Sequence, residues 1–175
     1  ADHTSDILLA PTPTAISHLE REGLADKTIS SGDIMLDTVL HNVKLAAEKS
    51  NILEENELTG KSFAIATCHR AENTNDTHRL KSILDTFNEI AAKGTLIVFP
   101  MHPRTKNMLP NVLPDWSPHE NLRVIEPVGY LDMLQLVAEA QMALTDSGGL
   151  QKEAFFLNTP CITMRDETEW VETIE

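Results

Sequence analysis

The chain has 175 residues, enough for one domain or for one domain with part of a second, and its 14 Lys and Arg against 27 Asp and Glu give a formal net charge of −13. Hydrophobic residues make up 41% and charged residues 23%, the composition of a packed globular protein. So negative a chain is not a general binder of nucleic acid or of anionic membranes, because both need a positive surface. The negative net charge is still compatible with a local basic pocket for one small anion.

Seven short apolar segments predict strands, in chain order at residues 7–10, 27–30, 62–67, 95–99, 122–125, 142–145 and 161–164. Several of them, such as residues 95–99, are apolar almost without interruption. That pattern is typical of strands buried on both faces, as in a parallel sheet covered by helices on its two sides.

Amphipathic helices are predicted between the strands, because apolar residues there recur every three or four positions. The clearest helix starts after Asn75 or Asp76, either of which can cap it, and ends before Gly94. Its buried face is expected to consist of Leu80, Ile83, Leu84, Phe87, Ile90 and Ala91. Strands that alternate with helices in this way predict an α/β fold, a Rossmann-like parallel sheet with helices on both faces.

Further expectations concern two other helices, the proline-rich segment and the end of the chain. A helix that begins at Asp33 is expected to bury Leu36, Leu40, Val43 and Ala47. Another, near residues 131–140, is expected to bury Leu134, Val137 and Ala138. The proline-rich segment 108–121 is expected to be a loop, and residues 170–175 are expected to lie in a helix.

The strongest candidate site follows the predicted strand 142–145, where Ser147, Gly148 and Gly149 open a helix. Two glycines let an anion approach the backbone, and the free N–H groups of the first helical turn point at it with the positive end of the helix dipole. Ser147 adds a hydroxyl, and Glu153 lies one to two turns further on, where it can accept hydrogen bonds from a ribose. A tight turn capped by Ser147 would explain the same residues without any ligand.

Two other predicted strands end in polar residues. His69 and Arg70 follow one of them, and His102, which Pro103 holds extended, follows another. An adjacent His and Arg are natural donors to a phosphate, and both strand ends lie in the segment 61–106, where seven Lys and Arg stand against four Asp and Glu. Each feature alone also fits an ordinary surface dipeptide or a capped loop. The three strand ends together favour a site, because ligands of doubly wound sheets bind at the carboxyl ends of the strands.

Metal and thiol chemistry are not expected. Cys68 and Cys161 lack the paired spacing of a zinc site or of a disulfide framework, and the histidines lack the spacing of metal ligands. Cys68 adjoins His69, but no acidic partner accompanies the pair, which argues against a cysteine nucleophile.

Five motifs occur in an order that resembles one protein family. They are CHRAEN at residues 68–73, PMHP at 100–103, PVGY at 127–130, TDSGGLQKEA at 145–154 and MRDETE at 164–169. Together with PTPT at 11–14 and GDIMLD at 32–37, they make the chain similar to the non-hydrolysing UDP-N-acetylglucosamine 2-epimerases. The resemblance extends over essentially the whole chain.

The resemblance implies a glycosyltransferase-B-like fold, in which two Rossmann-like domains hold the sugar nucleotide between them. Members of the family convert UDP-GlcNAc into UDP-ManNAc without a cofactor, by eliminating UDP to a 2-acetamidoglucal and adding it back on the other face. By this resemblance Ser147, Gly148 and Gly149 hold the diphosphate and Glu153 holds the uridine ribose.

The resemblance also assigns roles to the other two strand ends. It implies that His69 and Arg70 lie near the phosphates or the cleft, with His69 as the catalytic residue of this chain. In family members with an activating second UDP-GlcNAc, the positions that match Arg70, Glu72 and His102 are near that effector. The chain departs from many bacterial members at Ala71, where they have a second arginine, and at Trp170, where they have an arginine that contacts the substrate.

The same resemblance divides the chain into two parts. Residues 1–31 are expected to form the last strand, helix and strand of the N-terminal domain, and residues 32–175 the C-terminal UDP-binding domain without its final segment. The carboxylates that transfer the C2 proton are expected in the part of the N-terminal domain that precedes residue 1. We therefore expect a fragment that is inactive alone, from a cytoplasmic homodimer.

Two alternative functions remain open from the residues themselves. A UDP-sugar glycosyltransferase of the same fold class would also use a glycine-rich turn and an acid for the ribose. A non-catalytic nucleotide-binding module would need no more than these features. The ordered CHRAEN and DSGG motifs favour the epimerase over both.

Overall fold

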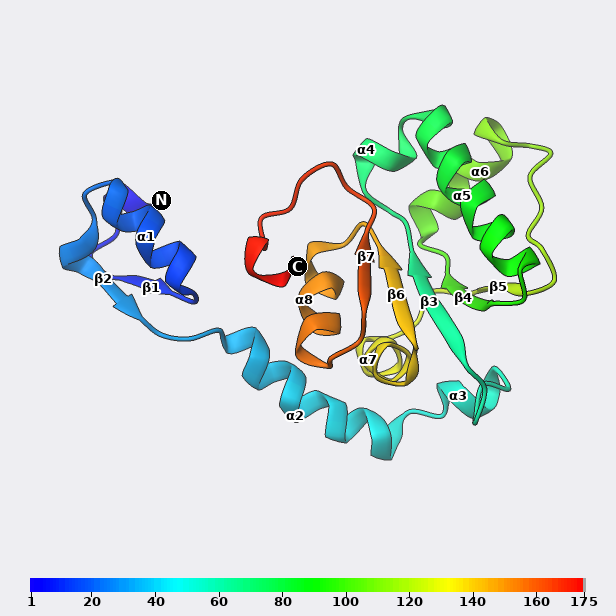
Figure 1. The fold of residues 1–175 in the computed structure, drawn as a ribbon, viewed down its shortest axis with the longest axis horizontal. Coiled ribbons are helices and arrows are strands. Elements are labelled where there is room, and N and C mark those ends of the chain that lie inside the picture. Colours follow the sequence, from blue (N-terminus) through cyan, green and yellow to red (C-terminus); the bar gives the residue numbers. More distant parts are fainter. Residues whose placement is uncertain (175) are drawn as a thin grey trace.

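The computed structural model describes residues 1–174 and arranges seven parallel strands in two sheets (Figure 1). A two-stranded sheet pairs β1 with β2, and a five-stranded sheet has the order β5-β4-β3-β6-β7. The bounds are β1 Leu8–Ala10, β2 Thr28–Ser30, β3 Phe63–Thr67, β4 Leu96–Pro100, β5 Leu122–Ile125, β6 Met142–Thr145 and β7 Cys161–Thr163. The predicted strands and the predicted Rossmann-like α/β fold are thereby confirmed.

The first sheet belongs to a small strand–helix–strand unit that Figure 1 shows apart from the larger sheet. Its helix α1 (Pro13–Arg21) begins with a proline at the first position and with the Thr12 hydroxyl accepting a hydrogen bond from the Ala15 N–H at 3.1 Å. Two 3₁₀ helices complete the unit, η1 (Asp2–Thr4) and η2 (Ala25–Lys27). Gly32, at φ +71°, connects the unit to the rest of the chain.

Helices cover both faces of the larger sheet. Alternate residues of each strand point to opposite faces, so both sets of side chains contribute to a core. On one side Ala64 and Ala66 of β3 pack against α5 (Thr77–Ala92), and α6 (Pro103–Val112) contributes Leu109 to the same core. On the other side Phe63 and Ile65 pack with residues of α3 (Ile52–Glu55), α7 (Tyr130–Glu139) and α8 (Gly148–Phe156). Four hydrophobic residues of the predicted α5 face, Leu80, Leu84, Phe87 and Ala91, are fully buried, and Asp76 caps the helix.

The helix that follows Asp33, α2 (Ile34–Lys49), was predicted correctly, but its expected buried face was wrong. Leu36 and Leu40 are 36% and 46% exposed, whereas Val39 and Ala46 are fully buried against Leu134 of α7. The reason is that α2 packs on other helices rather than on the sheet, as Figure 1 shows, so its contact stripe is narrow. Ala47 is likewise exposed, and Val43 is only half-buried.

The segment expected to be a loop from residue 108 is helical as far as Val112. Pro103 occupies the first turn of α6, where no N–H is needed, and the His102 ring accepts a hydrogen bond from the Arg104 N–H. Pro110 removes one hydrogen bond near the end of the helix, which a helix stabilised by packing tolerates. At the chain's end, a 3₁₀ helix, η3 (Val171–Thr173), replaces the helix expected for residues 170–175, of which residue 175 lies outside the described residues.

The order of the five strands reverses beside β3. The chain proceeds from β3 through β4 to β5 on one side, then returns to place β6 and β7 on the other. The carboxyl ends of β3 and β6 are therefore neighbours that lead into α4 (Ala71–Thr74) and α8. Such a switch point leaves a crevice in which α/β proteins bind ligands.

Candidate functional site

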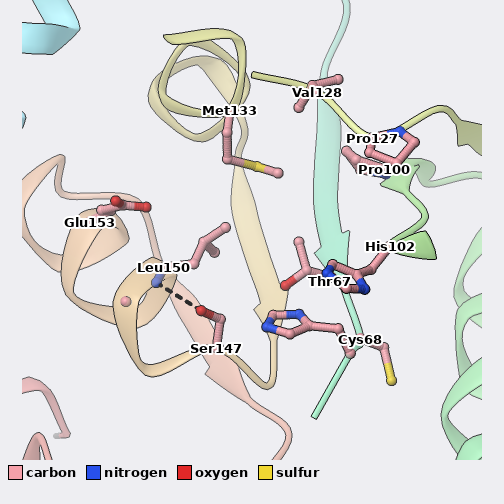
Figure 2. A pocket seen from close by; sticks show the side chains of 12 residues that line it. Thr67, Cys68, Pro100, His102, Pro127, Val128, Met133, Ser147, Leu150 and Glu153 are labelled. Atoms are coloured by element: carbon pink, nitrogen blue, oxygen red, sulfur yellow. Dashed lines mark hydrogen bonds between the residues drawn. The ribbon is translucent and has the colours of Figure 1, made fainter. Parts of the chain in front are cut away.

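A cavity of about 280 Å³ lies at this switch point (Figure 2). It brings together the ends of β3, β4 and β6, the loop before α7 and the first turns of α8. Its lining residues include five of the sequence-predicted site residues, namely His69, His102, Ser147, Gly149 and Glu153. The three polar strand ends thus meet in one place, as the sequence predicts for a doubly wound sheet.

The floor of the cavity is the N-terminus of α8. Ser147 is the N-cap, and its hydroxyl accepts a hydrogen bond from the Leu150 N–H at 3.3 Å, the dashed line in Figure 2. The Thr145 hydroxyl accepts from the Ser147 N–H at 2.9 Å and shares a 2.6 Å hydrogen bond with Thr67, which fixes the turn to both strands. Gly149 is exposed beside the cap, so the first-turn amides stay accessible to an anion.

Gly148 is buried and faces a different neighbour. A Cβ at this position would lie 2.6 Å from Glu169 Oε1 and 3.2 Å from Trp170 Nε1. The missing side chain therefore allows the segment after β7 to approach the start of α8 closely. Of the two predicted glycines, Gly149 lines the cavity, whereas Gly148 lies against Glu169 and Trp170.

Glu153 projects from α8 at the side of the cavity opposite His102 (Figure 2). Only 9% of Glu153 is exposed, and this burial raises the pKa of its carboxyl to about 7, although a hydrogen bond with Tyr130 acts in the other direction. A buried carboxylate without a cationic partner is costly, which is typical of a group kept for a ligand. Its two oxygens can accept hydrogen bonds from the two hydroxyls of a ribose.

His69 stacks on His102 with the ring centroids 5.3 Å apart and the planes at 26°. Burial lowers the pKa of the His69 imidazole, His102 and Arg70 lower it further, and only Asp146 opposes them. At neutral pH His69 is therefore mainly neutral, with one nitrogen able to accept a proton. Both rings line the cavity, as does the α8 N-cap Ser147.

Asp146 is the main feature that sequence reasoning missed. Its side chain is fully buried and accepts hydrogen bonds from the N–H groups of His69 and Arg70 at 2.9 and 2.8 Å and from Asn73 Nδ2 at 3.0 Å. A carboxylate so placed fixes the path of the CHRAEN segment at the switch point. The only signal in the sequence is an acid directly after an apolar strand, and the sequence pattern does not separate it from the glycine-rich turn that follows.

Arg70 and Glu72 lie outside the cavity lining. Arg70 is the N-cap of α4. Its guanidinium is 3.6 Å from the carboxylate of Glu169, which also forms an ion pair with Arg165 at 2.7 Å. A hydrogen bond from its own backbone N–H lowers the pKa of the Glu169 carboxyl, and the two arginines lower it further. Glu72 is exposed on α4, while His102 is in the cavity, so the three residues expected at an effector site are not gathered in one cavity.

A buried lysine joins α8 to the start of α2. Lys152 is 6% exposed, forms an ion pair with Asp33 and lies 3.9 Å from the ring centroid of Trp170. The ion pair and the Met35 N–H lower the pKa of Asp33 against the effect of its burial. Trp170 thus packs on a cation.

Cysteine chemistry has no support in this geometry. Cys68 is buried, burial raises the pKa of its thiol, and Asp146 raises it further. Its side chain belongs to the core on the α5 face of the sheet and points away from the cavity in Figure 2. Within residues 1–174, no three His, Cys, Asp or Glu side chains are grouped as a metal site would require.

Comparison with known proteins gives this site a context. The family model for UDP-N-acetylglucosamine 2-epimerase matches residues 1–175. The chain belongs to the UDP-N-acetylglucosamine 2-epimerase family. This confirms the resemblance seen in the ordered motifs.

Individual members of the epimerase family align along nearly the whole chain. A UDP-N-acetylglucosamine 2-epimerase homolog of Methanococcus maripaludis is 44% identical over 99% of this chain and 48% of its own length. The UDP-2,3-diacetamido-2,3-dideoxy-D-glucuronate 2-epimerase of Pseudomonas aeruginosa is 43% identical over 99% of this chain and 47% of its own. The chain therefore spans about half the length of the curated relatives it matches.

Solved epimerase structures agree with the fold. The UDP-GlcNAc 2-epimerase of Methanocaldococcus jannaschii in complex with UDP-GlcNAc and UDP is 40% identical and superposes with a TM-score of 0.87, covering 99% of this chain and 49% of that one. These relatives have the glycosyltransferase-B-like fold, of which the present chain matches one half.

Proposed function

We propose that this chain supplies the UDP-binding half of a UDP-N-acetylglucosamine 2-epimerase. The observation that carries the proposal is the convergence of the α8 N-terminus, Glu153 and His69 on one cavity at the sheet's switch point. An anion site and a ribose acceptor on the same helix suit a nucleoside diphosphate. The small strand–helix–strand unit of residues 1–31, with its own sheet, is proposed to belong to the other Rossmann-like domain, and residues 32–175 to the UDP-binding domain.

In the proposed reaction the base removes the C2 proton, the C1–O bond breaks, and UDP leaves with the bonding electrons to give a 2-acetamidoglucal. UDP then adds back to C1, and a proton is delivered to the opposite face of C2. The chain's own part is to hold the diphosphate through Ser147 and Gly149, where the helix dipole stabilises the charge that develops as UDP departs. Neutral His69 lines the same cavity, and a ring nitrogen with a lone pair can accept a hydrogen bond or a proton from a hydroxyl of the bound UDP-sugar.

The C2 proton transfer is proposed to reside elsewhere in the whole protein. Among the described residues, Glu153 is the one carboxylate that lines the cavity. Because Glu153 is proposed to bind the ribose, it is not the base that removes the C2 proton. We expect residues 1–175 alone to bind UDP without producing UDP-ManNAc from UDP-GlcNAc, as followed by proton NMR. The whole protein should produce UDP-ManNAc from UDP-GlcNAc with no acceptor present; a product that forms only with an acceptor would favour a glycosyltransferase.

Calorimetric titration with UDP tests the binding role directly. Ser147→Ala removes a hydroxyl that can donate to the diphosphate, a loss worth about 1 kcal/mol, so UDP should bind about fivefold more weakly. The exposed Ser117→Ala is the matched control and should bind like the parent chain. The absence of UDP binding to the parent chain would contradict the proposal and favour a purely structural module.

Glu169 is expected to oppose UDP binding. Its carboxylate lies against Gly148 and beside Arg70, close to where the diphosphate is proposed to bind. Glu169→Gln removes this competing charge, and the exposed ion pair is worth at most about 1 kcal/mol, so UDP should bind about two- to fivefold more tightly. Glu167→Gln is the neighbouring control. Weaker binding by the Glu169 variant alone would instead make Glu169 a ligand contact.

No helix in the described part of the chain has the length and apolar character needed to cross a membrane. For the whole protein we propose a UDP-sugar as the ligand, a cytoplasmic location and a homodimeric state. Sedimentation equilibrium of the whole protein would test the dimer, and a concentration-independent monomer mass would contradict it.

A further inference from the structure

The two oxygens of the Asp146 carboxylate have different surroundings, although both accept a hydrogen bond from the His69 N–H. Oδ2 accepts hydrogen bonds from the His69 N–H at 2.9 Å, the Arg70 N–H at 2.8 Å and Asn73 Nδ2 at 3.0 Å. Oδ1 is 3.1 Å from the His69 N–H and lies 3.4 Å from the His69 ring nitrogen Nδ1. Oδ2 therefore accepts all three of the backbone and Asn73 hydrogen bonds, while Oδ1 shares only the His69 N–H and is the oxygen that faces the imidazole.

This division matters for the chemistry of His69. A neutral imidazole carries its proton on one nitrogen, and a carboxylate beside Nδ1 favours the tautomer in which Nδ1 is protonated. Nε2 then keeps a lone pair and is the nitrogen available to a ligand in the cavity that His69 lines. The other charged or titratable groups facing His69 are His102, from the end of β4, and Arg70, its neighbour in the chain.

We propose that Asp146 is a positioning residue that sets the tautomer and the orientation of His69, so that Nε2 faces the bound UDP-sugar as a proton acceptor. The inference rests on the proposed function only for the identity of the ligand. Asp146 is fully buried and does not line the cavity, so it acts through His69 rather than on the substrate.

A single substitution separates this role from a structural one. In Asp146→Asn the amide oxygen can take the place of Oδ2 and keep the hydrogen bonds from His69 N–H, Arg70 N–H and Asn73. The amide NH₂ then takes the place of Oδ1, where it is a donor instead of an acceptor. Of the backbone hydrogen bonds only the longer one from the His69 N–H to Oδ1 is lost, while the group that faces Nδ1 changes from an acceptor to a donor.

The measurement is two-dimensional ¹⁵N–¹H NMR of the imidazole nitrogens across pH, on the chain without ligand. In the parent chain we expect the pattern of an Nδ1-protonated neutral ring for His69. In Asp146→Asn we expect the Nε2-protonated pattern and a lower His69 pKa, because the negative charge that opposes the other neighbours is gone. Asp85→Asn removes the same charge from the exposed face of α5 and should change neither.

The outcomes are distinct. An unchanged tautomer and pKa in a folded Asp146→Asn chain would overturn the proposal, as would an Nε2-protonated ring in the parent chain. If Asp146→Asn does not fold, the parent spectrum still decides, since the proposal requires Nδ1 to be protonated there. UDP titration of the parent chain is independent of these spectra, so a failure of the proposed function is recognised separately.

Discussion

Replacing Glu153 with Gln is expected to stabilise the protein at pH 8 and to weaken its binding of UDP. Burial raises the pKa of Glu153 from 4.5 to about 7. Between these two values the folded chain retains a proton that the unfolded chain releases, so this group's contribution to stability is present below pH 4.5 and is lost as the pH rises to 7. The parent chain should lose about 3 kcal/mol of unfolding free energy over this pH range, and the Gln variant should not, because Gln does not ionise.

Urea denaturation of both chains at pH 5, 6, 7 and 8 would measure this difference. The free energy of unfolding of Glu153→Gln minus that of the parent should increase as the pH rises, and this difference should become constant above pH 7. The variant should also bind UDP about 10- to 100-fold more weakly, because a charged acceptor for the ribose hydroxyls is lost. A constant difference in stability across this range would contradict the assigned environment of Glu153.

Replacing Phe99 with Ala is expected to cost about 3–5 kcal/mol of unfolding free energy. Phe99 is fully buried in the centre of the sheet and meets Phe87 of α5 edge-on, with ring centroids 5.5 Å apart. The cavity left behind would border the end of β4, from which His102 reaches the site. Lower UDP affinity should therefore accompany the loss of stability.

Phe155→Ala is the matched control for that experiment. Phe155 is 51% exposed on α8, so the same truncation there should cost less than about 1 kcal/mol. Thermal or urea unfolding of the two variants side by side provides the comparison. Equal losses would mean that the α5 side of the sheet is not the core that its burial indicates.

The strands were predictable because burial on both faces leaves a direct mark on the sequence. Uninterrupted apolar runs such as β4 have few alternatives to a parallel strand. Helix α5 was predictable for a related reason, since it packs directly on the sheet and needs a broad apolar face. Helix α2 rests on other helices, and the side that meets them is decided by α7 and α8 rather than by its own largest residues.

The site was predictable in its parts but not in its connections. Glycines after a strand and polar strand ends indicated where an anion could bind, and the structure gathers those ends in one cavity. The contacts of Asp146 with His69 and of Lys152 with Asp33 join residues far apart in the sequence. No local periodicity records such a contact, so only the folded arrangement shows that these acids and bases are paired.

The Asp146 contacts also have a consequence for the order of folding. They link amides to a carboxylate 76 and 77 residues further along the chain, across the pairing of β3 with β6. Contacts of such long range form only after a large loop has closed, whereas β3 and β4 are neighbours along the chain. During synthesis the hydrogen bonds between the CHRAEN segment and Asp146 can form only after β6 and Asp146 have been translated. We therefore expect its amides to become protected from hydrogen exchange later than those at the β3–β4 pairing.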